Sequence, residues 1–118
     1  MILVDTSVWV DHFRRGNPRL GNLLEDGAAL CHPFVSGELA CGTLRDRATT
    51  LELFGALPVA AVATDVEALA FLEARRLMGR GLGYIDVHLL AAASLSGTRL
   101  WTLDKRLAEA ARQLGLYS

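Results

Sequence analysis

Short apolar runs rich in branched residues alternate along the chain with stretches whose apolar positions recur every three or four residues. The first run, residues 1–4, is continuously apolar and ends at Asp5, which predicts a buried parallel strand. Further strands are predicted over residues 28–32, 59–62 and 98–103, with a brief terminal one at 116–117. Each strand except the last is followed by a segment with a helical pattern.

Capping residues define where these helices begin. Ser7 is predicted to be the N-cap of a helix to about Arg14, and Asn17 with Pro18 is predicted to begin a second helix that ends near Gly27. The other predicted helices cover residues 34–45, 48–57, 64–78, 85–96 and 104–114. The helix over 64–78 opens with a capping box, and the last one opens with an aspartate cap.

Regular alternation of strands and helices predicts an α/β protein: a parallel sheet with helices on both faces. At 118 residues the chain is long enough for one hydrophobic core, so we expect a single domain over 1–118. Ligands of such sheets bind at the carboxyl ends of the strands. Asp5 and Asp104 each follow a strand directly, so both should lie at that edge.

Four acidic residues lie in settings where solvated surface charge is a poor explanation. Asp5 follows four apolar residues, and Asp86 shares a helix face with Leu89, Leu90 and Ala93. Buried carboxylates are costly unless they are paired or bind a cation.

The other two acidic positions are weaker on their own. Glu38 has apolar neighbours at helical spacing, and Asp104 follows the apolar run 100–103 but would serve equally well as a simple N-cap. The chain has one lysine, Lys105, and no arginine placed to neutralise all four acids. A divalent cation is the economical solution, and ligation by oxygen alone points to Mg²⁺, or Mn²⁺, rather than zinc.

Other candidate sites are less convincing. His12, His32 and His88 share no spacing typical of a metal site or a catalytic triad, and His88 suits a structural or surface role. Cys31 and Cys41 match no zinc or redox motif, so we expect buried free thiols. Gly79, Gly81 and Gly83 follow a helix and precede no P-loop lysine, which indicates a flexible connection rather than a phosphate loop.

Composition restricts the class of protein further. A hydrophobic content of 52% excludes a disordered chain, and a net charge of −1 argues against a protein that coats nucleic acid by bulk electrostatics. No apolar run approaches the ~18–20 residues that span a bilayer. The first residues have no basic segment typical of a signal peptide, so we expect a cytosolic protein with no membrane partner.

The segments VDTSVWVDHF, SGELACG, GYIDVHLLAAA and LWTLDKRL resemble the four sequence blocks of PIN-domain proteins, especially VapC-type toxins of prokaryotic toxin–antitoxin pairs. The resemblance covers essentially the whole chain. It implies a three-layer α/β/α fold and a catalytic quartet of Asp5, Glu38, Asp86 and Asp104. It also implies Mg²⁺-dependent endoribonuclease activity on single-stranded or looped RNA, and inhibition by a cognate VapB-type antitoxin.

Within that quartet, Asp5 and Asp86 are assigned the main metal contacts because their sequence contexts are the most apolar. Glu38 and Asp104 would complete the shell through water, position a second ion or orient the attacking water. The resemblance makes the hydroxyl residues Thr6 and Ser7 second-tier contacts to metal-bound water or substrate.

Protein partners are expected on helical surfaces. Apolar stripes on the first two helices suit core packing or, as the resemblance suggests, an amphipathic antitoxin segment; their members are Trp9, Phe13, Leu20, Leu23 and Leu24. Helices carrying residues 69–77 or 85–93 would contribute to a homodimer, and the toxin and antitoxin would form a hetero-oligomer.

Three other functions fit parts of the sequence. Asp5 after the first strand suits the nucleophile of a haloacid-dehalogenase-like phosphatase, but that family usually has a second Asp where this chain has Ser7. A PIN-domain nuclease for RNA processing would use the same acidic site without a toxin role. A PIN scaffold that binds RNA or protein without cutting would not need the intact acidic set.

Overall fold

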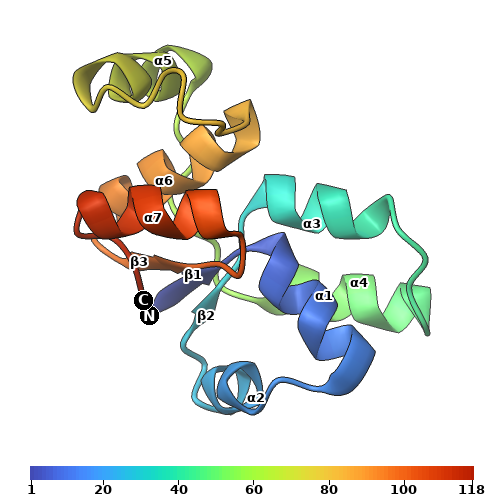
Figure 1. Cartoon of the computed structure of the whole chain (residues 1–118). Helices are drawn as coiled ribbons and strands as arrows, with labels where there is room; N and C mark the ends of the chain where they lie inside the picture. Colours follow the sequence, from blue (N-terminus) through green and yellow to red (C-terminus); the bar gives the residue numbers. More distant parts are fainter.

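A computed structural model describes residues 1–118 (Figure 1). Its elements, in chain order, are β1 (Ile2–Val4), α1 (Thr6–Arg15), α2 (Pro18–Glu25), β2 (Ala29–Leu30), α3 (Pro33–Ala40), α4 (Arg47–Ala56), α5 (Asp65–Ala74), α6 (Tyr84–Ser96), β3 (Arg99–Trp101) and α7 (Lys105–Gln113). None of these helices combines the length and apolar character needed to cross a bilayer.

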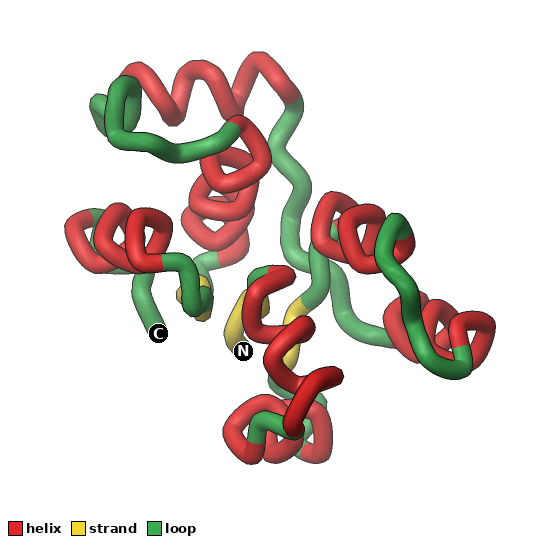
Figure 2. Tube along the Cα trace, turned by 45° about the vertical axis from the view of Figure 1, so that its right-hand side comes forward, coloured by secondary structure: helices red, strands yellow, loops and turns green.

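The three strands form a parallel sheet in the order β2-β1-β3. Leu3 pairs with Leu30 on one side and with Leu100 on the other, so all three strands end at the same edge. Figures 1 and 2 show the sheet in the middle, with α5, α6 and α7 on one side and α1, α3 and α4 on the other. The predicted α/β architecture with a central parallel sheet is confirmed.

Two predicted strands are reduced to single bridges. Residues 59–62 pair with the sheet only through Cys31 and Val59, and residues 116–117 only through Leu100 and Tyr117. Val59 and Val62 are 57% and 48% exposed. A run of branched residues makes a strand only where a face is buried, and here the apolar side chains face solvent instead.

Two predicted helices end early. The helix expected over 34–45 ends at Ala40, and the Arg47 guanidinium donates hydrogen bonds to the carbonyls of Ala40 and Gly42 (2.6 and 3.1 Å), which satisfies its last turn. The helix expected over 64–78 ends at Ala74, after which Arg76 adopts a left-handed conformation (φ 52°). The early end of α3 also leaves Cys41 exposed, although it was expected to be buried.

The hydrophobic core fills both sides of the sheet. Leu3, Val4 and Leu100 contribute from the strands, and the buried length of α6 runs from Val87 to Ala93. Trp9 is 3% exposed and packs edge-on against Phe54, so this member of the α1 stripe is core. Core packing also holds for Leu20, Leu23 and Leu24, whereas Phe13 remains 45% exposed.

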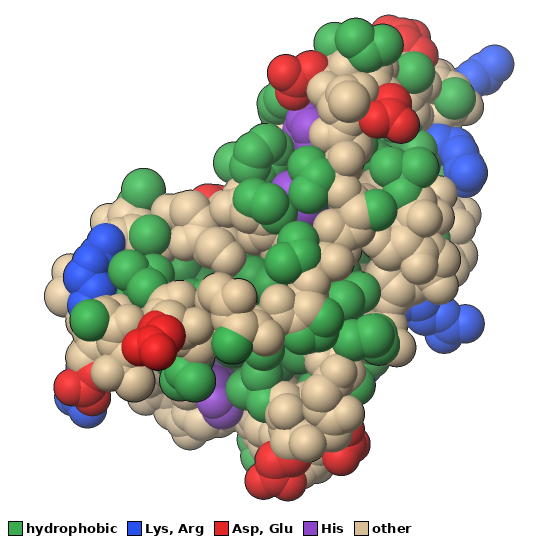
Figure 3. Space-filling view, turned by 180° about the vertical axis from the view of Figure 1, so that it is seen from behind, with side chains coloured by type: hydrophobic (Ala, Val, Ile, Leu, Met, Phe, Trp, Pro, Cys, Tyr) green, Lys and Arg blue, Asp and Glu red, His purple; other side chains and the backbone are tan.

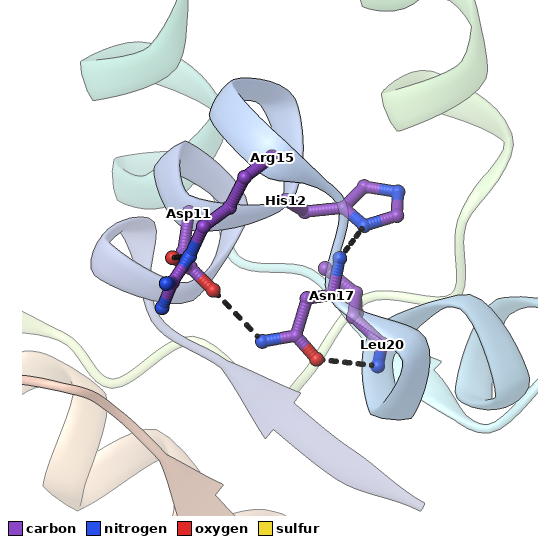
Figure 4. A network of polar contacts seen from close by, with 5 residues as sticks. All are labelled: Asp11, His12, Arg15, Asn17 and Leu20. Atoms are coloured by element: carbon purple, nitrogen blue, oxygen red, sulfur yellow. Dashed lines mark hydrogen bonds and ion pairs between the residues drawn. The ribbon is translucent and has the colours of Figure 1, made fainter.

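The connection between α1 and α2 is fixed by side chains (Figure 4). The Asn17 side-chain oxygen caps α2 by accepting from the Leu20 amide (3.1 Å), and the Asn17 side-chain amide donates to Asp11 (3.1 Å). The Asn17 backbone amide donates to His12 Nδ1 (3.0 Å), and Arg15 pairs with Asp11 at 2.7 Å. This turn directs α2 back along the sheet and leaves the opposite end of α1, beside Asp5, at the strand ends.

Candidate functional site

Asp5 lies where β1 ends and α1 begins. It occupies the N-cap position, but its carboxylate makes no capping bond and is only 8% exposed. Instead, the hydroxyls of Ser7 and Thr102 both donate to Asp5 Oδ2, each at 2.7 Å. One oxygen is therefore clamped by two donors, while Oδ1 has no hydrogen-bond partner in the protein.

Thr102 is a site residue that the sequence reasoning missed. It is 1% exposed, and besides donating to Asp5 its hydroxyl accepts from the Asp104 amide (3.0 Å). Ser7 completes the connection, because its hydroxyl lies 3.2 Å from that of Thr102 and accepts from the Leu103 amide (3.0 Å). The available signal was a hydroxyl residue inside the apolar run that precedes Asp104.

Asp104 is the N-cap of α7, and its Oδ1 accepts from the Leu107 amide (3.0 Å). The capping role left open by the sequence is therefore present. The side chain is exposed, and Oδ2 is left without a protein partner. One carboxylate oxygen thus holds the helix end while the other is available to a ligand.

Asp86, in the first turn of α6, connects the four acids electrostatically. Its carboxylate is half-buried and accepts from the Gly83 amide (2.9 Å). Burial raises the pKa of Asp86, the Gly83 hydrogen bond opposes that rise, and the negative charges of Asp5, Asp104 and Glu38 raise it further. All three other predicted site acids are therefore close enough to act on Asp86.

Glu38 projects from α3 and is exposed, with its Oε1 accepting from the Thr6 hydroxyl (3.0 Å). A hollow of about 570 Å³ begins here and runs along α1 past Val10 and Phe13. Its far wall is the segment between α3 and α4 together with Thr50. Glu38 and Thr6 therefore lie where the acidic cluster opens into a groove.

A column of aromatic rings holds α3 against α6. Ring centroids are 5.1 Å apart between His32 and Phe34, 4.8 Å between Phe34 and His88, and 4.7 Å between His88 and Tyr84. His32 caps α3 by accepting from the Phe34 amide on Nδ1 (3.0 Å), and burial, with a smaller contribution from His88, lowers its pKa to about 4. The structural role expected for His88 is confirmed.

The donor chemistry of the acidic cluster fits a hard divalent cation. No three His, Cys, Asp or Glu side chains are close enough to coordinate one ion jointly as they are placed. Arg15 pairs with Asp11, and His88 Nε2 lies 3.2 Å from Asp65 Oδ1; neither contact involves the cluster. The three other acids thus act on Asp86 with no ion pair to offset them, and oxygen ligands of this kind suit Mg²⁺ or Mn²⁺.

Known proteins resemble this chain in sequence and in fold. The PIN domain family matches residues 2–113. Ribonuclease VapC32 of Mycobacterium tuberculosis is 48% identical over 117 residues, which is 98% of this chain and 94% of that protein.

Two crystal structures share the fold at low sequence identity. FitAcB from Neisseria gonorrhoeae has a TM-score of 0.64 at 19% identity and covers 95% of this chain and 94% of its own. PAE2754 from Pyrobaculum aerophilum has a TM-score of 0.61 at 18% identity and covers 94% of this chain and 79% of its own.

Proposed function

This chain belongs to the PIN-domain family, among the VapC-type ribonucleases, and on that basis we propose that it is a Mg²⁺-dependent endoribonuclease, the toxin of a VapBC-type pair. The observation that carries the proposal lies at the carboxyl edge of the sheet, where the negative charges of Asp5, Asp104 and Glu38 raise the pKa of Asp86. The chemistry is hydrolysis of an RNA phosphodiester bond. Membership of this family also sets aside the phosphatase alternative for Asp5.

Asp5 and Asp86 are the proposed metal ligands, since they are the least exposed of the four acids. Bound Mg²⁺, or Mn²⁺, would neutralise phosphate charge and lower the pKa of its water. The Ser7 and Thr102 hydroxyls orient Asp5 by hydrogen bonds to one oxygen and leave the other for a ligand. Asp86 is oriented by the Gly83 amide.

Glu38 and Asp104 are the proposed residues that orient water and complete the shell. Thr6 holds Glu38 through one hydrogen bond, and α7 holds Asp104 through its capping bond. The second-tier residues are therefore proposed to position the acids: Thr6 positions Glu38, and Ser7 positions Asp5. A carboxylate with a free oxygen is suited to accept a proton from the attacking water.

Cleavage of defined single-stranded and looped RNAs with and without Mg²⁺ tests this function. Asp5→Asn keeps an acceptor for the two hydroxyls but removes the negative charge, so we expect activity to fall about 10²- to 10⁴-fold with the fold intact. Asp26→Asn, an exposed change at the end of α2, is the matched control. Undiminished cleavage by Asp5→Asn, or by the wild type in EDTA, would contradict the proposal.

The toxin role is tested separately from cleavage. Induction of the wild-type gene in a host cell should arrest growth, and induction of the Asp5→Asn variant should not. A wild type that cleaves RNA in vitro but leaves growth unaffected would favour an RNA-processing nuclease. A wild type that binds RNA without cutting it would instead favour a PIN scaffold.

The hollow along α1 is the proposed binding site of the VapB-type antitoxin. Its wall combines apolar Val10, Phe13 and Leu39 with the Glu38 carboxylate at one end. An amphipathic antitoxin segment would cover the apolar wall, and a basic residue on it would reach the acidic cluster. Trp9 is excluded as a contact because it is buried in the core.

Phe13→Glu tests the antitoxin site at a partly exposed side chain, and circular dichroism checks that the variant is folded. We expect it to weaken the complex with the cognate antitoxin, while Leu95→Glu, a comparably exposed apolar position on α6, leaves it unchanged. Affinity is measured by calorimetry on purified partners. Equal affinities for the two variants would show that the antitoxin binds elsewhere.

The outer face of α5 is the proposed homodimer interface. Two helices were predicted to contribute to a homodimer. Residues 87–93 of α6 are buried within the protein, so α5 is the one of the two that has an exposed apolar face. Val66 and Leu69, three residues apart, are 78% and 52% exposed, and Figure 3 shows hydrophobic side chains at this end of the molecule, at upper right. Light scattering should give twice the chain mass for the wild type and the single mass for Val66→Lys with Leu69→Lys. A monomeric wild type would refute this interface.

A further inference from the structure

The glycine-rich connection before α6, expected to be merely flexible, has specific contacts at two of its glycines. The Gly83 amide donates to Asp86 (2.9 Å). Gly81 adopts a left-handed conformation (φ 76°), and the side chain of Arg106 lies in the space that a Cβ would occupy. Such a Cβ would lie 2.8 Å from Nη1 and 2.9 Å from Cδ of Arg106. The left-handed backbone favours glycine at this position, and a Cβ there would displace the end of the Arg106 side chain.

Arg106 connects two parts of the acidic site. It belongs to the first turn of α7, two residues after Asp104, and its side chain reaches Gly81, two residues before the glycine that binds Asp86. The guanidinium thus extends from the helix that carries one acid to the loop that orients another.

No protein anion uses the Arg106 guanidinium. The ion pairs of the protein lie elsewhere, at Arg15–Asp11 and His88–Asp65. The hydrogen-bond partner of Asp86 is the Gly83 amide, and Arg106 forms no ion pair with that acid. The guanidinium N–H groups of Arg106 have no acceptor in the protein. A guanidinium of this kind beside an acidic cluster is suited to bind an anionic group of a ligand.

We propose that Arg106, whose side chain lies on Gly81, binds a backbone phosphate of the RNA substrate; this rests on the proposed nuclease function. Four carboxylates repel an approaching phosphate, and a fixed cation at their rim offsets that repulsion. The guanidinium matches phosphate oxygens in a two-pronged geometry, and the first turn of α7 adds partial positive charge. Arg106 is a substrate-binding residue, and the acids remain the reacting centre.

The test separates binding from cleavage. A fluorescent single-stranded RNA is titrated at several salt concentrations onto the full chain carrying Asp5→Asn, with and without Arg106→Ala. We expect Arg106→Ala to weaken binding about tenfold and to reduce the slope of log affinity against log salt by about 1. Arg99→Ala is the matched control, because Arg99 is exposed at the opposite end of β3 from Asp104.

Cleavage kinetics and conservative variants add a second readout. In the otherwise wild-type chain, Arg106→Ala should raise KM and leave kcat nearly unchanged, and Arg106→Lys should recover part of the KM. Gly81→Ala should act in the same direction by displacing the arginine. Circular dichroism confirms that each variant is folded.

The outcomes distinguish this inference from the function on which it rests. If the wild type cleaves RNA but Arg106→Ala matches Arg99→Ala in affinity, salt slope and KM, the Arg106 assignment is wrong and the nuclease stands. If Arg106→Ala weakens only the antitoxin complex, the guanidinium serves that partner and the assignment is again wrong. If the wild type cleaves no RNA with Mg²⁺ or Mn²⁺, the nuclease itself is refuted.

Discussion

Asp5 and Asp104 follow the ends of two paired strands, whereas Glu38 and Asp86 project from helices α3 and α6. In the strand-borne pair, one buried hydroxyl, that of Thr102, bonds the Asp5 carboxylate and the Asp104 amide together. In the helix-borne pair, Asp86 accepts from the nearby Gly83 amide, Glu38 accepts from the Thr6 hydroxyl of α1, and no hydrogen bond joins the two acids.

This difference separates a rigid half of the site from an adjustable half. Pairing of Val4 with Trp101 fixes where the two strands end, so Asp5 and Asp104 inherit their separation from the sheet. The relative position of Glu38 and Asp86 is set by the packing of α3 on α6 through the column of aromatic rings that begins at His32. We therefore expect site variants to be most damaging in the strand-borne half.

Among the groups that position the acids, the largest effect is expected at the shared hydroxyl. Thr102→Val preserves shape but leaves Asp5 with one donor and the Asp104 amide without its acceptor. Loss of such an orienting group costs about 10- to 100-fold in activity or metal affinity. Thr102→Ser should restore most of the cleavage rate. A fully active Thr102→Val would show that the strand ends alone position Asp5.

The cap of α3 should make the protein sensitive to acid. Because the pKa of His32 is about 4 in the folded state against an ordinary 6.5, the unfolded chain takes up the proton first as the pH falls. The free energy of unfolding should therefore decline between pH 6.5 and 4, by about 2 kcal/mol from this residue.

Denaturant titrations across that range test the role of His32. His32→Asn retains an acceptor at the cap but does not titrate, so its stability should fall less over the same interval. If the two proteins lose stability in parallel, the acid sensitivity belongs to another group.

The smallest effect is expected for the exposed hydrogen bond of the adjustable half. Thr6→Val removes the only side-chain partner of Glu38, and a net bond of 0.5–1 kcal/mol corresponds to about a 2- to 5-fold loss of cleavage rate. Rates are compared with those of Thr102→Val under identical Mg²⁺. A Thr6 variant as damaged as the Thr102 variant would remove the distinction between the two halves.

The strand-borne half was also the more predictable from sequence. An apolar run that ends in aspartate signals both a strand and its carboxyl edge, so the positions of Asp5 and Asp104 followed from local pattern and parallel pairing. Asp86 stood out through its apolar neighbours. The assignment of Glu38 to the site depended mostly on family resemblance, because an exposed acid on a helix has no local sequence pattern that marks it as functional.

Features that depend on long-range contacts were not predictable in this way. The Thr102 hydroxyl acts on a residue 97 positions away, which no local pattern encodes. The end of α3 is set by Arg47, beyond the helix itself, and the strand expected over 59–62 failed because its valines are not covered. The role of Gly81, which leaves space for the Arg106 side chain, became evident only from the contact between these two residues.

A count of Mn²⁺ ions bound by the purified protein, from the paramagnetic resonance signal of free Mn²⁺, tests the acidic site most directly. The wild type and Asp26→Asn should bind Mn²⁺ equally and release it to Mg²⁺, whereas Asp5→Asn and Asp86→Asn should each bind at least about tenfold more weakly. Equal Mn²⁺ binding by all four proteins, or none by the wild type, would contradict a cation site built from these carboxylates.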